Sequence, residues 1–201
     1  MHLTALQPDA AAEIVCVVVM LCWLGFGAIV VVGKRGAAPG SQRRNWKSMM
    51  GLLLQGSGYA ICFAAFRPYF SPLFPMSKTA ETILAVLTTA LALASTWFCY
   101  AAARALGKQW ALVARVIEGH ELVSTGPYSV VRNPIYLAMF GMLIATALAV
   151  GRWQALLPAA IVYLIGTAIR ISTEERLLRS TFGVKFDDYA RRVPALLPRL
   201  L

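Results

Sequence analysis

The sequence predicts an all-α protein that is embedded in a membrane. Of its 201 residues, 59% are hydrophobic and only 14% are charged, and the mean hydropathy is +0.65. A soluble domain of this length is about half apolar and about a quarter charged. Apolar runs in lipid fold as helices because each backbone polar group must be satisfied within its segment. The composition therefore excludes a water-soluble enzyme, a disordered chain and a secreted disulfide scaffold.

Five uncharged apolar runs predict five transmembrane helices, since a helix needs about 20 apolar residues to cross the hydrocarbon core. The runs are residues 14–33, 48–66, 82–103, 133–151 and 153–169. The first run is interpreted as a membrane anchor, because no basic segment precedes it and no convincing cleavage site follows it. The fifth run is short, and we expect its helix to continue through Arg170. The last two runs meet at Gly151 and Arg152, which predicts a tight antiparallel hairpin.

The basic residues predict the orientation of these helices. Sixteen of the nineteen Lys and Arg residues fall in the loop after the first run, in the linker after the third run and in the C-terminal tail. Because Lys- and Arg-rich loops stay in the cytoplasm, we expect the N-terminus outside and the C-terminus in the cytoplasm. The bilayer thus explains the net charge of +10 without a nucleic-acid partner. The small size favours a bacterial inner membrane.

No metal site is predicted. The four cysteines lie inside apolar runs without CxxC or CxxxH spacing, and a buried cysteine usually behaves as a small hydrophobic residue. The only histidines are His2 and His120, so a zinc site would lack ligands.

The chain divides into an N-terminal three-helix part, residues 1–103, and a C-terminal half, residues 104–201, in which polar segments are long. We expect the linker 104–132 and the tail 170–201 to cap the inner ends of the fourth and fifth helices. Beyond Glu175 the tail has apolar residues near helical spacing, with a break at Gly183. This pattern predicts two short amphipathic helices on the membrane surface.

Two clusters in this half are candidates for chemistry. Arg170 and Glu174 are four residues apart on one helix, so their side chains meet. Charged groups at the edge of the hydrocarbon tend to mark binding sites, although an interfacial salt bridge with snorkelling side chains is the alternative. Before the fourth helix, Asn133 is a plausible N-cap and Pro134 fits the first turn. A free helix N-terminus is an anion site.

A series of short motifs runs through the same half of the chain. In order, they are Arg104-x-x-Gly107-x-x-Trp110, His120-Glu-Leu-Val, Gly-Pro-Tyr128, Arg132-Asn133-Pro134-x-Tyr136, Arg170-x-x-x-Glu174-Glu175, Phe182-Gly and Tyr189-x-x-x-Val193-Pro. The series resembles the isoprenylcysteine carboxyl methyltransferase family over residues 104–198. The first three helices match that family only in number and hydrophobicity.

This resemblance implies an integral membrane enzyme that transfers a methyl group from S-adenosylmethionine to a lipophilic acceptor. It implies a cytoplasmic cofactor pocket formed by the linker before the fourth helix, the hairpin of the fourth and fifth helices and the tail. The residues that would contact the cofactor are His120, Glu121, Leu122, Val123, Tyr128, Asn133, Pro134, Ile135, Tyr136 and Glu174. Arg170 would bind the methyl acceptor, which makes Arg170 and Glu174 the predicted catalytic residues.

The resemblance leaves the acceptor open. Animal members of the family typically have His where this chain has Asn133, and an amide does not act as a general base. A carboxylate acceptor, such as that of a prenylated cysteine, needs no base because it is ionised near neutral pH. Arg170 favours such an acceptor. The alternatives are N-methylation of a phospholipid or other lipid amine, an NADPH-dependent sterol-type reductase, whose members are much longer, and a non-catalytic membrane scaffold.

Overall fold

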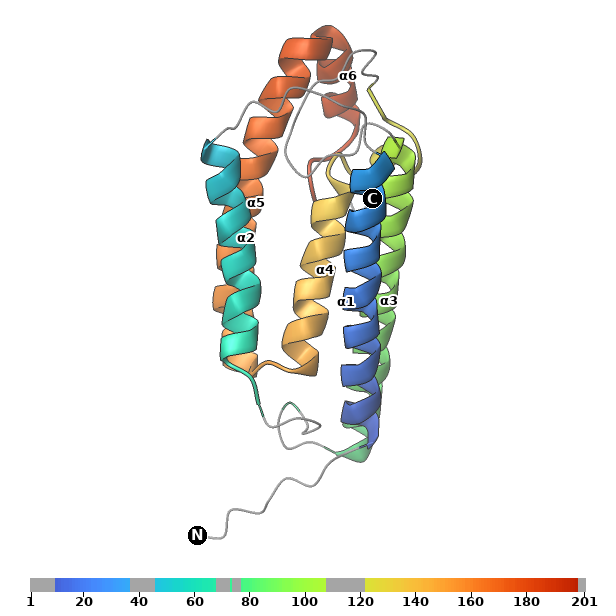
Figure 1. The fold of residues 1–201 in the computed structure, drawn as a ribbon, viewed down its shortest axis with the longest axis vertical. Coiled ribbons are helices and arrows are strands. Elements are labelled where there is room, and N and C mark those ends of the chain that lie inside the picture. Colours follow the sequence, from blue (N-terminus) through green and yellow to red (C-terminus); the bar gives the residue numbers. More distant parts are fainter. Residues whose placement is uncertain (1–9, 37–45, 68–72, 74–76, 108–121, 199–201) are drawn as a thin grey trace.

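The protein is a bundle of helices. The computed structural model describes residues 10–36, 46–67, 73, 77–107 and 122–198 (Figure 1). Its elements are α1 (Ala10–Gly36), α2 (Trp46–Ala64), α3 (Lys78–Leu106), the 3-10 turn η2 (Gly126–Ser129), α4 (Pro134–Ala149), α5 (Trp153–Phe182) and α6 (Val184–Arg192). These described residues include no strand, only a single bridge between Phe66 and Gly151. The predicted all-α fold is confirmed, and so is the continuation of α5 through Arg170.

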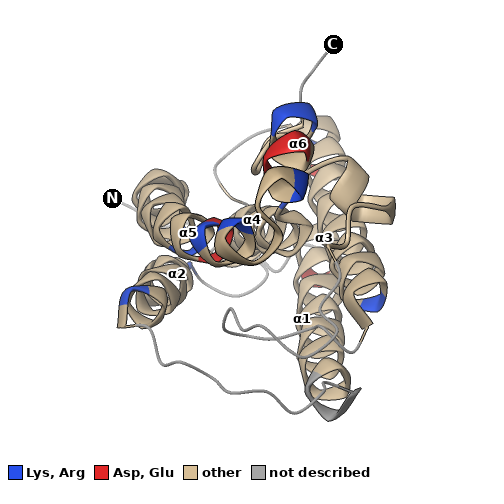
Figure 2. Ribbon diagram, turned by 90° about the horizontal axis from the view of Figure 1, so that it is seen from above, with Lys and Arg blue, Asp and Glu red and all other residues tan. Residues whose placement is uncertain are grey.

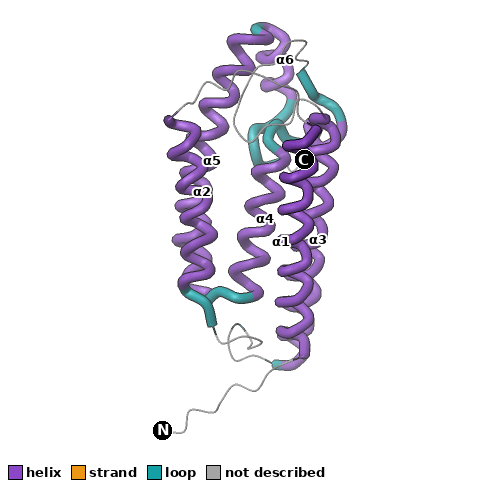
Figure 3. The backbone as a smooth tube through the Cα atoms, in the orientation of Figure 1, coloured by secondary structure: helices purple, strands orange, loops and turns teal. Residues whose placement is uncertain are grey.

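The five long helices run side by side. α2 packs against α5, while α3 packs against both α1 and α4 (Figure 1). The short α4–α5 connection lies at one end of the bundle, and η2 and α6 lie at the other end, where most of the described loop residues gather (Figure 3). The described parts of the predicted cap, residues 122–132 and the tail from α6 to residue 198, lie at this second end.

Among the described residues, three helices are long and apolar enough to cross a membrane by length and composition: Ala10–Gly33 within α1, α3 and α5. α4 is apolar but has only 16 residues, because Pro134 begins it and the hairpin ends it. α2 has 19 residues and includes Lys47 and Gln55. Large apolar side chains on the outer faces are exposed, among them Leu24, Leu53 and Leu157 at 71%, 68% and 69%. An apolar exterior of this kind fits a lipid environment.

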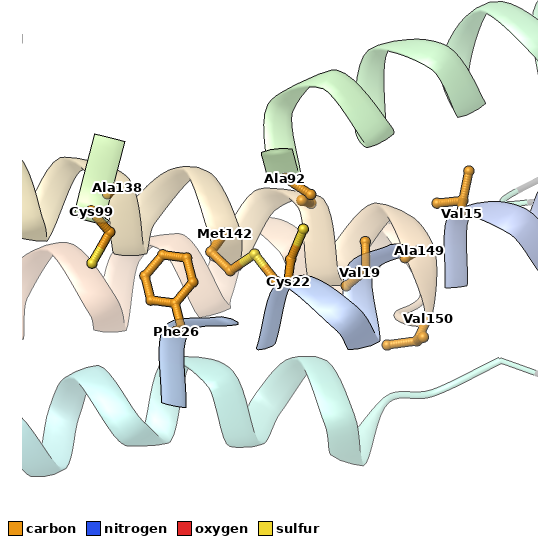
Figure 4. Close-up of a cluster of buried hydrophobic side chains, with 11 residues drawn as sticks. Val15, Val19, Cys22, Phe26, Ala92, Cys99, Ala138, Met142, Ala149 and Val150 are labelled. Carbon is orange, nitrogen blue, oxygen red and sulfur yellow. The ribbon is translucent and has the colours of Figure 1, made fainter. Parts of the chain in front are cut away.

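The main core lies between α1, α3 and α4 (Figure 4). Val19 and Phe26 of α1, Ala92 and Cys99 of α3 and Met142 of α4 are buried in it. All four cysteines are free, and three of them are buried. This confirms the prediction that they pack as small hydrophobic residues.

Glycines allow α2 and α5 to approach closely. A Cβ atom on Gly166 would lie 2.6 Å from the backbone oxygen of Gly51, and one on Gly51 would lie 2.6 Å from Cγ of Arg170. Small residues at such contacts are typical of helix pairs in membranes. A buried hydrogen bond from Gln55 Nε2 to Thr167 Oγ1, 2.9 Å long, joins the same two helices. The contact sets α2 directly beside Arg170.

Arg67 secures the opposite end of the bundle. Its guanidinium donates hydrogen bonds to the carbonyl oxygens of Leu148, Ala149 and Gly151, at 2.8, 2.8 and 3.0 Å. These are orphan carbonyls at the end of α4, which cations stabilise. Burial lowers the pKa of Arg67 to about 10, so the side chain stays charged at neutral pH. The α4–α5 hairpin is thereby tied to the end of α2.

Candidate active site

Arg170, Tyr136 and Glu174 form one hydrogen-bonded cluster, here called the Arg–Tyr–Glu cluster, between α4 and α5. Arg170 is only 3% exposed. Its Nε donates to the hydroxyl oxygen of Tyr136 at 2.8 Å, and its Nη2 donates to Glu174 Oε1 at 3.2 Å. The Tyr136 hydroxyl donates in turn to Glu174. The guanidinium carbon also lies 5.2 Å from the centre of the Tyr136 ring. The predicted contact between Arg170 and Glu174 is present, with a tyrosine as its third member.

Tyrosines elsewhere in the helices hold this cluster in place. The Tyr163 hydroxyl of α5 donates to the backbone oxygen of Tyr136 at 2.9 Å, and the Tyr59 hydroxyl of α2 donates to that of Met139 at 2.6 Å. The rings of Tyr59 and Tyr163 pack edge to face, with centroids 5.9 Å apart. Sequence analysis did not single out these two residues. The available signal was a tyrosine hydroxyl within an apolar run, because polar groups in such runs tend to face the interior of a helix bundle.

The neighbouring carboxylate, Glu175, faces a different partner. Arg132 binds Glu175 Oε1 through Nε at 2.9 Å and through Nη2 at 2.8 Å. Its Nη1 donates to the backbone oxygens of Ala190 and Val193, at the end of α6. Both side chains are largely buried, at 13% and 16% exposed. The two adjacent glutamates therefore divide their roles: Glu174 joins the Arg–Tyr–Glu cluster and Glu175 anchors the tail.

A short segment after α6, residues 193–195 and here called the tail strap, lies against the start of α4. The backbone N–H groups of Arg132 and Asn133 donate to the carbonyl oxygens of Pro194 and Ala195, at 2.8 and 3.1 Å. Asn133 Nδ2 also donates to Ala195, at 2.9 Å. Asn133 is the N-cap residue of α4, as predicted, but its side chain makes no cap hydrogen bond. The amide is turned toward the tail strap instead.

The tail also differs from the two surface helices that its sequence predicts. The first is the continuous end of α5, and the break comes at Gly183, where φ is +53°. Phe186 and Tyr189 of α6 are buried against Leu122 and Phe182 rather than spread on a membrane surface. One short helix, α6, therefore follows α5 instead of the two expected, and its apolar face finds partners within the protein. Its position on a membrane surface stays a prediction.

A tyrosine ties α6 to the turn before α4. The Tyr189 hydroxyl donates to the backbone oxygen of Tyr128 at 2.6 Å. Burial raises the pKa of Tyr189 to about 12 and raises the pKa of Tyr128 further. Both phenols thus remain protonated at neutral pH, and Tyr189 keeps its donor. Tyr128, a predicted cofactor residue in η2, is in this way bonded to α6.

The predicted site residues gather at one end of the bundle. Charged residues of α5 and α6 lie at this end when it is seen from above (Figure 2). Tyr128, Pro134 and Tyr136 are buried, and the half-buried positions are Leu122, Val123, Asn133, Ile135 and Glu174. His120 and Glu121 lie outside the described residues. In the described ranges no three His, Cys, Asp or Glu side chains converge as metal ligands would.

Comparison with known proteins identifies the family. The model of the family described as phospholipid methyltransferase matches residues 83–185, which is half of the chain and contains α4, α5 and the Arg–Tyr–Glu cluster. The chain belongs to this family. The predicted resemblance to isoprenylcysteine carboxyl methyltransferases is also confirmed, because relatives with that name match. The description of the family names a methyltransferase and not a reductase, which removes support from the reductase alternative.

Curated relatives match only part of the chain. It is similar to the nickel-cobalt-cadmium resistance protein NccN of Alcaligenes xylosoxydans xylosoxydans, with 40% identity over 97 residues, 47% of this chain and 45% of the relative. The cobalt-zinc-cadmium resistance protein CzcN of Cupriavidus metallidurans is 39% identical over 101 residues, 47% and 44% of the two chains. The protein-S-isoprenylcysteine O-methyltransferase of Schizosaccharomyces pombe is 34% identical over 79 residues, 39% and 34%. The chain spans less than half the length of these relatives.

Proposed function

We propose that this protein is an S-adenosylmethionine-dependent methyltransferase embedded in a membrane, and that it methylates a lipophilic carboxylate such as that of a prenylated cysteine. The observation that carries the proposal is the Arg–Tyr–Glu cluster, which lies within the matched residues 83–185. A buried charge in a membrane helix is costly, and such residues tend to mark functional sites. A guanidinium is suited to carboxylates, which it binds bidentately.

The residues present fit the cofactor. S-adenosylmethionine carries a cationic amine and sulfonium and an anionic carboxylate, and it supplies an electrophilic methyl group when bound. Glu174 provides a carboxylate for a cation, with 21% of its side chain exposed, and the start of α4 offers the positive end of a helix. We assign the cofactor contacts to His120, Glu121, Leu122, Val123, Tyr128, Asn133, Pro134, Ile135, Tyr136 and Glu174.

The protein's main contribution to the reaction is alignment. Arg170 holds the acceptor carboxylate, and Tyr136 fixes both Arg170 and Glu174 through its hydroxyl. Holding two reactants in line supplies about 7–11 kcal/mol in favourable cases. The acceptor is already ionised near neutral pH, so no residue has to remove a proton from it. This is consistent with Asn133, whose amide carries no charge and contacts the tail strap.

We further propose that all five long helices span a bacterial inner membrane, with the N-terminus outside and the C-terminus in the cytoplasm. The positive-inside bias supports this orientation. α2 and α4 are short, yet Leu53 and Phe63 on α2 are exposed as lipid-facing residues would be. The first part, residues 1–103, contributes helices that pack on α4 and α5, and residues 104–201 carry the chemistry.

A lipid amine is the second candidate acceptor. The observation that favours it is Glu174, because a carboxylate attracts an ammonium headgroup. An amine must lose its proton before it attacks, whereas a carboxylate does not. Two relatives are named for resistance to metals, and these names specify no methyl acceptor. The acceptor class is thus open to a direct experiment.

Methyl transfer from labelled S-adenosylmethionine separates the two acceptors. With purified protein in lipid nanodiscs, we expect S-farnesyl-N-acetylcysteine to yield a base-labile methyl ester at a rate that is flat between about pH 6 and 8, since a carboxyl group with a pKa of about 4 stays ionised there. A lipid amine with a pKa of about 10 would instead yield a base-stable product, at a rate rising about tenfold per pH unit. The methyl ester of the same farnesyl compound is the control, because it has no free carboxylate and should accept no labelled methyl group. A base-stable product formed from phosphatidylethanolamine alone would contradict the carboxylate proposal.

A further inference from the structure

Ser48 is a buried polar residue of α2 whose hydroxyl has no hydrogen-bond partner among the described residues. The exposed fraction of Ser48 is 1%. Burying a hydroxyl without a partner is costly, so buried hydroxyl groups are nearly always bonded. An unpaired hydroxyl at such a position points to a ligand as its partner.

Helix packing places Ser48 beside the Arg–Tyr–Glu cluster. α2 and α5 run antiparallel, because Gly58 faces Ala159 and Tyr163 whereas Gly51 faces Gly166 and Arg170. Ser48 precedes Gly51 by three residues and therefore shares its face of the helix. It thus lies opposite the turn that follows Arg170, where Glu174 is located. The start of α2 lies alongside α5 in Figure 1.

The electrostatics of this position favour an anion. Ser48 lies in the first turn of α2, which begins at Trp46 and continues for 19 residues. The first turn of a helix carries the positive end of the helix dipole and attracts anions. Arg170 contacts α2 at Gly51 through its Cγ, one helical turn along α2 from Ser48. A hydroxyl donor, a helix N-terminus and a buried cation all suit an oxyanion.

We propose that Ser48 donates a hydrogen bond to an oxyanion in the acceptor headgroup, a carboxylate or a phosphate, so that α2 forms one wall of the acceptor subsite. This inference rests on the proposed methyltransferase function and deepens it. α2 lies outside the matched residues 83–185. The shared half of the chain therefore carries methyl transfer, whereas Ser48 contributes to the choice of acceptor.

The test compares Ser48→Ala with Ser57→Ala in the full-length protein. Ser57 lies on the same helix but is exposed, and its hydroxyl bonds back to Leu53. For Ser48→Ala we expect the KM for S-farnesyl-N-acetylcysteine to rise about tenfold, as for a lost hydrogen bond to a charged group. We expect kcat and the Kd for S-adenosylhomocysteine to be unchanged, which is the pattern for lost binding alone. Ser57→Ala should change none of these quantities.

Thermal unfolding without ligand gives a second readout: the same substitution that weakens acceptor binding should make the free protein more stable. Ser48→Ala removes an unpaired buried hydroxyl, so we expect the unfolding midpoint to rise by about 2–4 °C. If Ser48 served only to stabilise the fold, Ser48→Ala would lower the unfolding midpoint. A lower midpoint in Ser48→Ala, or an unchanged KM in an active protein, would overturn the proposal.

Ligand-induced stabilisation keeps this test separate from the proposed function. If the wild type transfers no methyl group, the proposed function fails, and the subsite is judged by binding alone. S-farnesyl-N-acetylcysteine should then raise the midpoint of the wild type more than that of Ser48→Ala, and its methyl ester should not; equal shifts would overturn the subsite. Dioctanoyl phosphatidic acid in place of the farnesyl compound distinguishes a phosphate from a carboxylate.

Discussion

Replacing Arg170 with Met is expected to abolish methyl transfer and to lower the free energy of unfolding by about 3 kcal/mol. Arg170 is buried and bonds both Tyr136 and Glu174. Methionine fills much of the same volume but leaves the Glu174 carboxylate without its cation. Removing one partner of a buried ion pair costs more than the pair itself contributes. Activity with S-farnesyl-N-acetylcysteine and chemical unfolding in detergent measure the two effects.

A double substitution separates charge from packing. Arg170→Met combined with Glu174→Gln should recover most of the lost stability, because no buried charge is then left unpaired. It should recover no activity. Arg176→Met is the matched control, because Arg176 lies on the same helix and is exposed. Normal activity in a folded Arg170→Met variant would contradict the role of Arg170.

Replacing Arg132 with Ala is expected to release α6 and the tail strap. Arg132 joins Glu175 to the carbonyl oxygens of Ala190 and Val193, and its loss leaves Glu175 without that partner. We expect opening of residues 184–198 to become easier by about 3 kcal/mol, or about a hundredfold faster hydrogen exchange of their amides. The affinity for S-adenosylhomocysteine should fall by about tenfold or more, because this segment bonds two predicted cofactor residues, Tyr128 and Asn133.

Arg191→Ala provides the comparison for this release. Arg191 lies on α6 and pairs with Asp188 on the surface, where its side chain is 73% exposed. Exposed pairs contribute about 0–1 kcal/mol, so exchange and cofactor affinity should stay near those of the wild type. Equal exchange rates in Arg132→Ala and Arg191→Ala would show that Arg132 does not hold the tail.

Local patterns were sufficient to predict several features of the fold and the cluster. The contact of Arg170 with Glu174 follows from helical spacing alone, and the break before α6 follows from Gly183. The continuation of α5 past residue 169 follows from the lack of a helix-breaking residue there. Each of these features depends on neighbours within a few residues in the chain, so the local sequence is enough to predict it.

The remaining features depend on residues that are distant in sequence. Asn133 is the N-cap residue that the local rule predicts, but the partner of its amide is Ala195, 62 residues later, which no local rule predicts. The packing of α6 requires Leu122, which lies before α4. Ser48 is an ordinary polar residue in an apolar run until the α2–α5 contact buries it. Helical periodicity predicts that such side chains share a face, but it does not predict which helix that face contacts.

Calorimetric binding of S-adenosylhomocysteine, the demethylated form of the cofactor, tests the proposed activity most directly. We expect detergent-purified wild type to bind with a micromolar Kd, and Glu174→Gln to lose this binding while remaining folded by circular dichroism. Glu13→Gln is the control, since Glu13 is exposed in the first turn of α1, and it should bind as the wild type does. A well-folded wild type that binds no S-adenosylhomocysteine would contradict the proposed cofactor site and the methyltransferase activity assigned to it.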